Sequence, residues 1–121
     1  MENIVKLIEQ TAVPGTVIPK PKARGDFIVK GWGRRRGERA LVYKIPNHND
    51  ERKPYEKGIT ESEWVAAHNR LNEAGDVTRE WFRCALTQCN AEGSCNFTTI
   101  GGVFELLGAA RYAERGTYVK V

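Results

Sequence analysis

The segment DFIVKGWGRRRGERALVYKIP, residues 26–46, contains two runs of β-branched and aromatic residues on either side of a turn flanked by glycines. Such runs favour β-strands, and the glycine-flanked turn predicts that they form a hairpin. Alternation in the second run places Arg39, Leu41, Tyr43 and Ile45 on one face, which we expect to lie against the core. The turn carries three consecutive arginines. The hairpin is therefore predicted to hold a strongly basic tip on an apolar anchor.

The residues before this hairpin divide into two parts of different composition. Within residues 1–13, apolar side chains recur at helical spacing and predict a short amphipathic helix. Residues 14–26 contain three prolines and two glycines, which oppose regular helix. We expect this second part to form an extended arm.

The residues after the hairpin follow a helical period. Thr60 is predicted to cap a helix at its N-terminus, and Glu63, three residues later, completes a capping box. A second helix is expected to begin at Asp76 or Thr78. A third fits residues 98–110, although the three glycines there each cost about 1 kcal/mol relative to alanine. Three helices are therefore predicted in the C-terminal half.

The tail GTYVKV, residues 116–121, alternates between polar and apolar residues and is expected to add a strand beside the hairpin. Together these elements predict an α+β fold. In it, a small antiparallel sheet of the basic hairpin plus the C-terminal strand packs on a three-helix, winged-helix-like segment. The length predicts a single domain. Its parts are an N-terminal helix (1–13), a Pro/Gly-rich basic arm (14–26), the basic hairpin (27–46), and a helical segment with the terminal strand (59–121).

Positive charge is concentrated in one segment. The chain has a net charge of +4, whereas residues 20–44 hold nine basic side chains against Asp26 and Glu38, a net +7 that leaves −3 on the remainder. This asymmetry favours a polyanionic partner. No apolar run is long enough to span a membrane, and the N-terminus lacks the pattern of a signal peptide. We expect a cytoplasmic protein with no membrane partner.

Nucleic-acid binding is the function that this charge pattern favours. Guanidinium groups match phosphate geometry and remain charged, and Trp32 would stack on a base if it points outward. We predict a non-enzymatic module that binds DNA or RNA. The residues expected to do so are Arg34, Arg35, Arg36 and Arg39 at phosphates, Lys20, Lys22, Arg24 and Lys30 along a wider basic track, and Trp32 as a stacking surface.

Several alternatives remain open from the sequence. The arginines could merely protect the edge of a sheet from aggregation. The same surface could bind an acidic protein, as in an inhibitor or adaptor. A third possibility is a small metal-dependent nuclease that uses Asp26, Glu38 and Lys44. The helix at 98–110 is expected to belong to the core, because Glu105 is its one charged residue before Arg111 and repels phosphate.

The three cysteines suggest a zinc site only weakly. Cys84, Cys89 and Cys95, with His48 or His68 as a fourth ligand, would supply the right atoms. However, their gaps of four and five residues differ from the two to four usual in structural zinc sites. We expect reduced thiols, and predict no metal, no cofactor and no catalytic residue.

Overall fold

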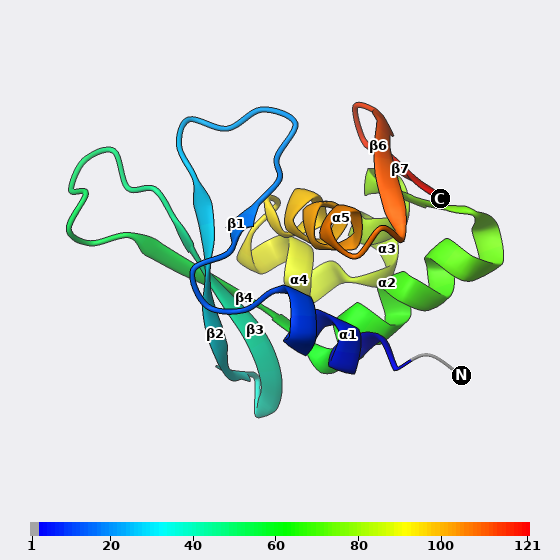
Figure 1. The fold of residues 1–121 in the computed structure, drawn as a ribbon, viewed down its shortest axis with the longest axis horizontal. Coiled ribbons are helices and arrows are strands. Elements are labelled where there is room, and N and C mark those ends of the chain that lie inside the picture. The colour runs from blue at the N-terminus through cyan, green and yellow to red at the C-terminus, as the bar shows by residue number, and fades with distance from the viewer. Residues whose placement is uncertain (1–2) are drawn as a thin grey trace.

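The computed structural model describes residues 3–121 as an α+β fold with two antiparallel sheets (Figure 1). None of the helices in this range is long and apolar enough to cross a membrane. The elements in chain order are α1 (Ile4–Thr11), β1 (Val17–Ile18), β2 (Phe27–Arg35), β3 (Glu38–Ile45), β4 (Tyr55–Thr60), α2 (Glu61–Ala74), β5 (Asp76–Thr78), α3 (Arg79–Ala85), α4 (Thr87–Glu92), α5 (Asn96–Leu106), β6 (Ala110–Glu114) and β7 (Thr117–Lys120).

The predicted hairpin is confirmed as the centre of a four-stranded sheet with the order β1-β2-β3-β4. Arg36 and Gly37 form its tip with φ of 54° and 75°, the left-handed conformation that both central residues of a type I′ turn require. Leu41 and Tyr43 are fully buried and Ile45 packs against the core, as predicted for this side of β3. Arg39 was predicted on the same face, but its side chain is 40% exposed and pairs with glutamates. Val42 points to the other face and is buried as well, so this part of the sheet is covered on both faces.

The predicted pairing of the C-terminal strand with the hairpin is wrong. β7 lies between β5 and β6 in a separate three-stranded sheet. The cause is the turn at Gly116, which has φ of 80° and folds β7 directly back on β6. The sequence assigned residues 107–110 to the third helix, but α5 ends at Leu106 and Gly108, with φ of 71°, turns the chain into β6.

The other predicted helices are found with altered boundaries. α1 lies inside the predicted 1–13 segment, of which residues 1 and 2 are outside the described part of the chain. The capping box of α2 is present as predicted between Thr60 and Glu63, and Gly75 ends that helix in a left-handed conformation. The second predicted helix is broken at Leu86 into α3 and α4.

Helix α5 occupies the middle of the molecule, between the two sheets (Figure 1). Eight of its eleven residues are buried, which agrees with its prediction as a core helix. The carbonyl oxygen of Pro19 lies 2.3 Å from the point where a Cβ on Gly102 would be, so β1 and the residue after it lie directly on α5. The aromatic core around it contains Trp64, Tyr43, Tyr118, Phe82, Phe97 and Phe104.

Candidate functional site

The last of the three arginines at the hairpin tip, Arg36, is held by two carboxylates. Arg36 donates to Glu63 of α2 at 2.5 Å and forms a second ion pair with Glu92 of α4. The hydrogen bond to Glu92 is the main cause of the raised pKa of Arg36, with the charge of Glu63 adding to it. Arg36 thus ties the tip of the sheet to two helices, and its charge is balanced within the protein.

Two more of the predicted phosphate-binding cations are also paired. Arg39 donates from Nη1 to Glu9 at 2.6 Å and to Glu61 at 3.1 Å. Its guanidinium carbon lies 4.2 Å from the ring centroid of Trp32, which is partly buried against the core. The ring face of Trp32 that Arg39 covers is therefore not open to a base. The other paired cation is Lys30, whose Nζ lies 3.0 Å from a carboxylate oxygen of Glu56.

The side chains of the remaining two arginines of the tip donate hydrogen bonds to backbone carbonyls. Arg34 donates to the carbonyl of Gly37 at 3.3 Å, and Arg35 donates to the carbonyl of Arg34 at 2.8 Å. The aliphatic part of Arg35 lies across Gly58, where a Cβ would be 2.8 Å from Arg35 Cγ. Arg34 and Arg35 are thus the two tip arginines without a carboxylate partner among the described residues.

The arm and the hairpin tip lie at opposite ends of β2. That strand has nine residues, and at about 3.3 Å per residue it spans about 30 Å. Lys22 and Arg24 precede its first residue, whereas Arg34 and Arg35 end it. The arm and the tip are therefore two separate basic regions.

Lys20, in the middle of the arm, anchors the arm to α5. Its Nζ donates to the carbonyl of Cys95 at 3.1 Å and to the hydroxyls of Thr98 at 2.9 Å and Thr99 at 2.6 Å. It also lies 4.2 Å from the ring centroid of Phe27. Burial lowers the pKa of Lys20 to about 7. These contacts fix the arm in place and leave Lys22 and Arg24 exposed beyond it.

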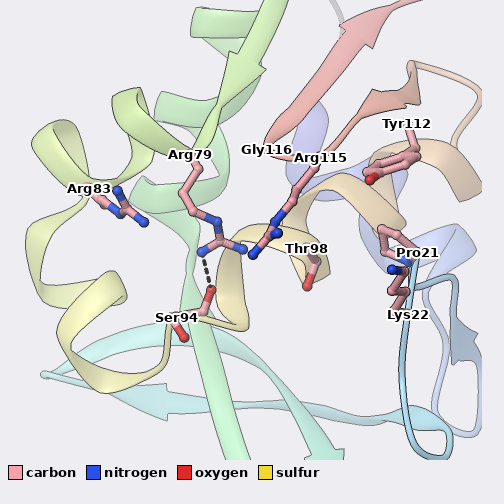
Figure 2. A pocket seen from close by; sticks show the side chains of 9 residues that line it. All are labelled: Pro21, Lys22, Arg79, Arg83, Ser94, Thr98, Tyr112, Arg115 and Gly116. Atoms are coloured by element: carbon pink, nitrogen blue, oxygen red, sulfur yellow. Dashed lines mark hydrogen bonds between the residues drawn. The ribbon is translucent and has the colours of Figure 1, made fainter.

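A cavity of about 850 Å³ lies where the arm, α3 and the β6–β7 turn meet (Figure 2). Four cationic side chains line it, and among residues 3–121 no aspartate or glutamate does. We call these four residues the cationic rim. They are Lys22, Arg79, Arg83 and Arg115, and the other lining residues are Pro21, Ser94, Thr98, Tyr112 and Gly116.

Arg79 is the fixed member of the cationic rim. Its backbone N–H donates to the carbonyl of Gly116 at 2.9 Å, which joins the start of α3 to the β6–β7 turn. Its Nη1 donates to the carbonyl of Ser94 at 3.0 Å (Figure 2), and its guanidinium lies 4.7 Å from the ring centroid of Phe97. The position of Arg79 is thus set by three contacts, none of them with an acid.

The cations of the rim repel one another. Burial lowers the pKa of Arg79, and the like charges of Arg83 and Arg115 lower it further. Within the described chain, Lys22, Arg83 and Arg115 form no ion pair. A cluster of like charges without counter-charge attracts anions, and its potential is focused by the walls of a cavity. The rim thus gathers four cations at one cavity, an arrangement that favours anion binding.

Sequence reasoning included Lys22 but missed Arg79, Arg83, Arg115 and Tyr112. The four cations of the rim come from three segments that the fold brings together, so they do not form a dense basic run in the sequence. The turn at Gly116 was the available signal, because a hairpin there places its flanking residues at an exposed tip.

The residues of the nuclease alternative do not come together. Glu38 and Lys44 are six positions apart on β3, about 20 Å, and Glu38 accepts hydrogen bonds from Ser62. Across residues 3–121, no group of three or more histidine, cysteine, aspartate or glutamate residues is placed to hold a metal ion. Of the cysteines, Cys89 is buried, and Cys84 is exposed.

Comparison of the chain with family models, curated proteins and solved structures gave no match. The function is therefore argued from the geometry of the chain itself.

Proposed function

We propose that the protein is a non-enzymatic nucleic-acid-binding module that holds phosphates at the cationic rim. The observation that carries this proposal is that four cations from three segments line one cavity without an acidic residue among the described part of the chain. Phosphate groups are the biological anions that arginine recognises best, since its planar fork donates two parallel hydrogen bonds.

The order of elements around the cavity supports a winged-helix-like arrangement. A helix (α2), a strand (β5), three further helices (α3, α4, α5) and a hairpin (β6–β7) follow in sequence, and the sheet order is β5-β7-β6. In this proposal the β6–β7 turn is the wing, and Arg115 lies at its tip. A wing that presents an arginine beside α3 would contact the phosphate backbone.

The hairpin tip is a second candidate contact surface in the same module. Arg34 is exposed and Arg35 is half-buried, and neither pairs with a described carboxylate. Arg36, Arg39 and Lys30 would each have to exchange an internal carboxylate for a phosphate, which reduces the net gain from binding. The proposal therefore gives the cationic rim the main role.

A salt series tests the proposal and separates the two surfaces. Binding to duplex DNA, single-stranded DNA and RNA is measured with the native chain, an Arg83→Gln/Arg115→Gln variant and an Arg34→Gln/Arg35→Gln variant. Both variants remove two charges that have no acidic partner among residues 3–121, so the two are matched. Each lost phosphate contact should lower the slope of log affinity against log salt by about 0.9 on duplex or about 0.7 on single strands.

We expect the Arg83→Gln/Arg115→Gln variant to lose the larger share of affinity and slope. A larger loss in the Arg34→Gln/Arg35→Gln variant would place the site at the hairpin instead. If the native chain shows no affinity for any of the three nucleic acids at low salt, the proposal is wrong. Recovery of one acidic protein in a pull-down would then favour the protein-interaction alternative.

A further inference from the structure

Tyr112 adds an exposed aromatic ring to the cationic rim. It is 37% exposed and lines the same cavity as the four cations. In the view of Figure 2, Tyr112 and Lys22 lie on one side of the cavity and Arg79 and Arg83 on the other. The site thus offers two kinds of contact, one for anions and one for a flat ring.

The ring of Tyr112 is held in position by its neighbours. It packs edge-to-face on the fully buried Tyr118, with 5.5 Å between ring centroids. These two residues are also cross-strand partners in the β6–β7 pair, and the backbone N–H of Tyr112 donates to Glu105 at 3.2 Å. A ring with a fixed orientation loses little conformational entropy when it binds a second ring.

We propose that the ligand of this cavity is single-stranded nucleic acid, with one base stacked on Tyr112 and its neighbouring phosphates on the cationic rim. This inference rests on the proposed function and specifies its substrate class. Proteins that bind single strands combine a basic groove with aromatic side chains on which bases stack. The cavity of about 850 Å³ is within the 300–1,000 Å³ typical of sites that enclose a small ligand, so it has room for a nucleotide unit.

The burial of α5 argues against recognition of a duplex by helix insertion. A helix that enters the major groove needs exposed polar side chains to contact base edges. Eight of the eleven residues of α5 are buried, and the arm crosses it so closely that Pro19 O would be 2.3 Å from a Cβ on Gly102. A duplex also hides the faces of its bases inside the stack, where Tyr112 cannot reach them. A single strand exposes both its phosphates and its bases to this site.

Fluorescence anisotropy with three labelled ligands of about 12 units tests the inference, a length within the usual site sizes. The ligands are a thymidine oligomer, an abasic oligomer with the same phosphates, and a duplex. The protein variants are Tyr112→Leu, Tyr112→Phe, and Tyr55→Leu as a matched control. Tyr55 is 54% exposed and lies on β4 in the other sheet.

We expect Tyr112→Leu to weaken binding of the thymidine oligomer by about 5- to 150-fold, the range for loss of one stacked base. Its salt slope should not change, because no phosphate contact is lost. Tyr112→Phe and Tyr55→Leu should bind like the native chain. The abasic oligomer should bind the native chain more weakly than the thymidine oligomer and should not distinguish the variants.

The outcomes separate the inference from the proposed function. If Arg83→Gln/Arg115→Gln weakens binding but Tyr112→Leu does not, the phosphate site stands and stacking on Tyr112 is wrong. Equal affinity of the native chain for the abasic and thymidine oligomers, or tighter binding of the duplex, also overturns the inference. These two comparisons use the native chain and so hold even if Tyr112→Leu fails to fold. Absence of binding to every ligand would refute the proposed function itself.

Discussion

Replacing either of two adjacent glycines in α5 by alanine should destabilise the protein, although alanine is the better helix former. In an exposed helix the exchange would gain about 1 kcal/mol. Here a Cβ on Gly101 would lie 2.2 Å from ring atoms of Tyr118, and one on Gly102 would lie 2.3 Å from the carbonyl oxygen of Pro19. Tyr118 is fully buried and Pro19 O belongs to the backbone, so neither contact can move away easily.

The magnitude follows from these overlaps. Both distances are more than 1 Å below the 3.4 Å at which ordinary contact begins. Overpacking a well-packed core costs about 1–3 kcal/mol, and overlaps of this size belong at the upper end. After subtracting the gain in helix propensity, we expect Gly101→Ala and Gly102→Ala each to lower the free energy of unfolding by about 2 kcal/mol.

Urea denaturation followed by far-ultraviolet circular dichroism measures this loss. Asn69→Ala, at an exposed position of α2, is the control and should change the free energy of unfolding by less than about 1 kcal/mol, in the stabilising direction. A stabilised Gly102→Ala variant would refute the reasoning, since β1 could not then lie on α5. In that case the arm would not cover α5, and the helix would be accessible to a DNA groove.

Two further predictions concern buried charge. Arg36→Gln should lower the free energy of unfolding by about 1–2 kcal/mol, because it leaves the nearly buried carboxylate of Glu63 without its cation, whereas Arg34→Gln should change it by less than about 0.5 kcal/mol. Equal effects in urea denaturation would contradict the ion pairs at the tip. Burial lowers the pKa of Lys20 from 10.5 to about 7, so between these values the folded protein binds fewer protons than the unfolded chain and becomes more stable as the pH rises. The stability of the native chain relative to Lys20→Met should therefore grow from pH 7 upward, by at most about 1.4 kcal/mol per pH unit, and a difference that is constant from pH 7 to 10.5 would refute the shift.

Features that depend on neighbouring residues were predictable from the sequence. The type I′ tip of the hairpin needs only Arg36 and Gly37 to adopt left-handed backbone, and the capping box needs only Thr60 and Glu63. Both motifs form their hydrogen bonds within a few positions along the chain. For this reason the hairpin and the start of α2 were located correctly.

Features that depend on distant segments were not predictable. β5 and β7 pair across about forty residues, and no pattern in either strand specifies that partner. The glycines of α5 appeared only as a cost to helix formation, because the sequence does not show that Tyr118 and Pro19 approach them. The composition of a helix thus indicates its intrinsic helix propensity. It does not show that Gly101 and Gly102 leave room for Tyr118 of β7 and Pro19 of the arm.

The same distinction applies to charge and explains why the proposed site moved from the hairpin to the cavity. A run of basic residues measures charge along the chain, but binding depends on charge that remains unbalanced in space. Three of the six hairpin cations are balanced by Glu9, Glu56, Glu61, Glu63 and Glu92. The glutamates of α1, α2 and α4 form ion pairs with Arg36 and Arg39, which thereby connect the sheet to the helices. The four cations of the rim lie far apart in the sequence and have no acidic residue in their cavity among residues 3–121, so their charge is available for a phosphate chain to neutralise.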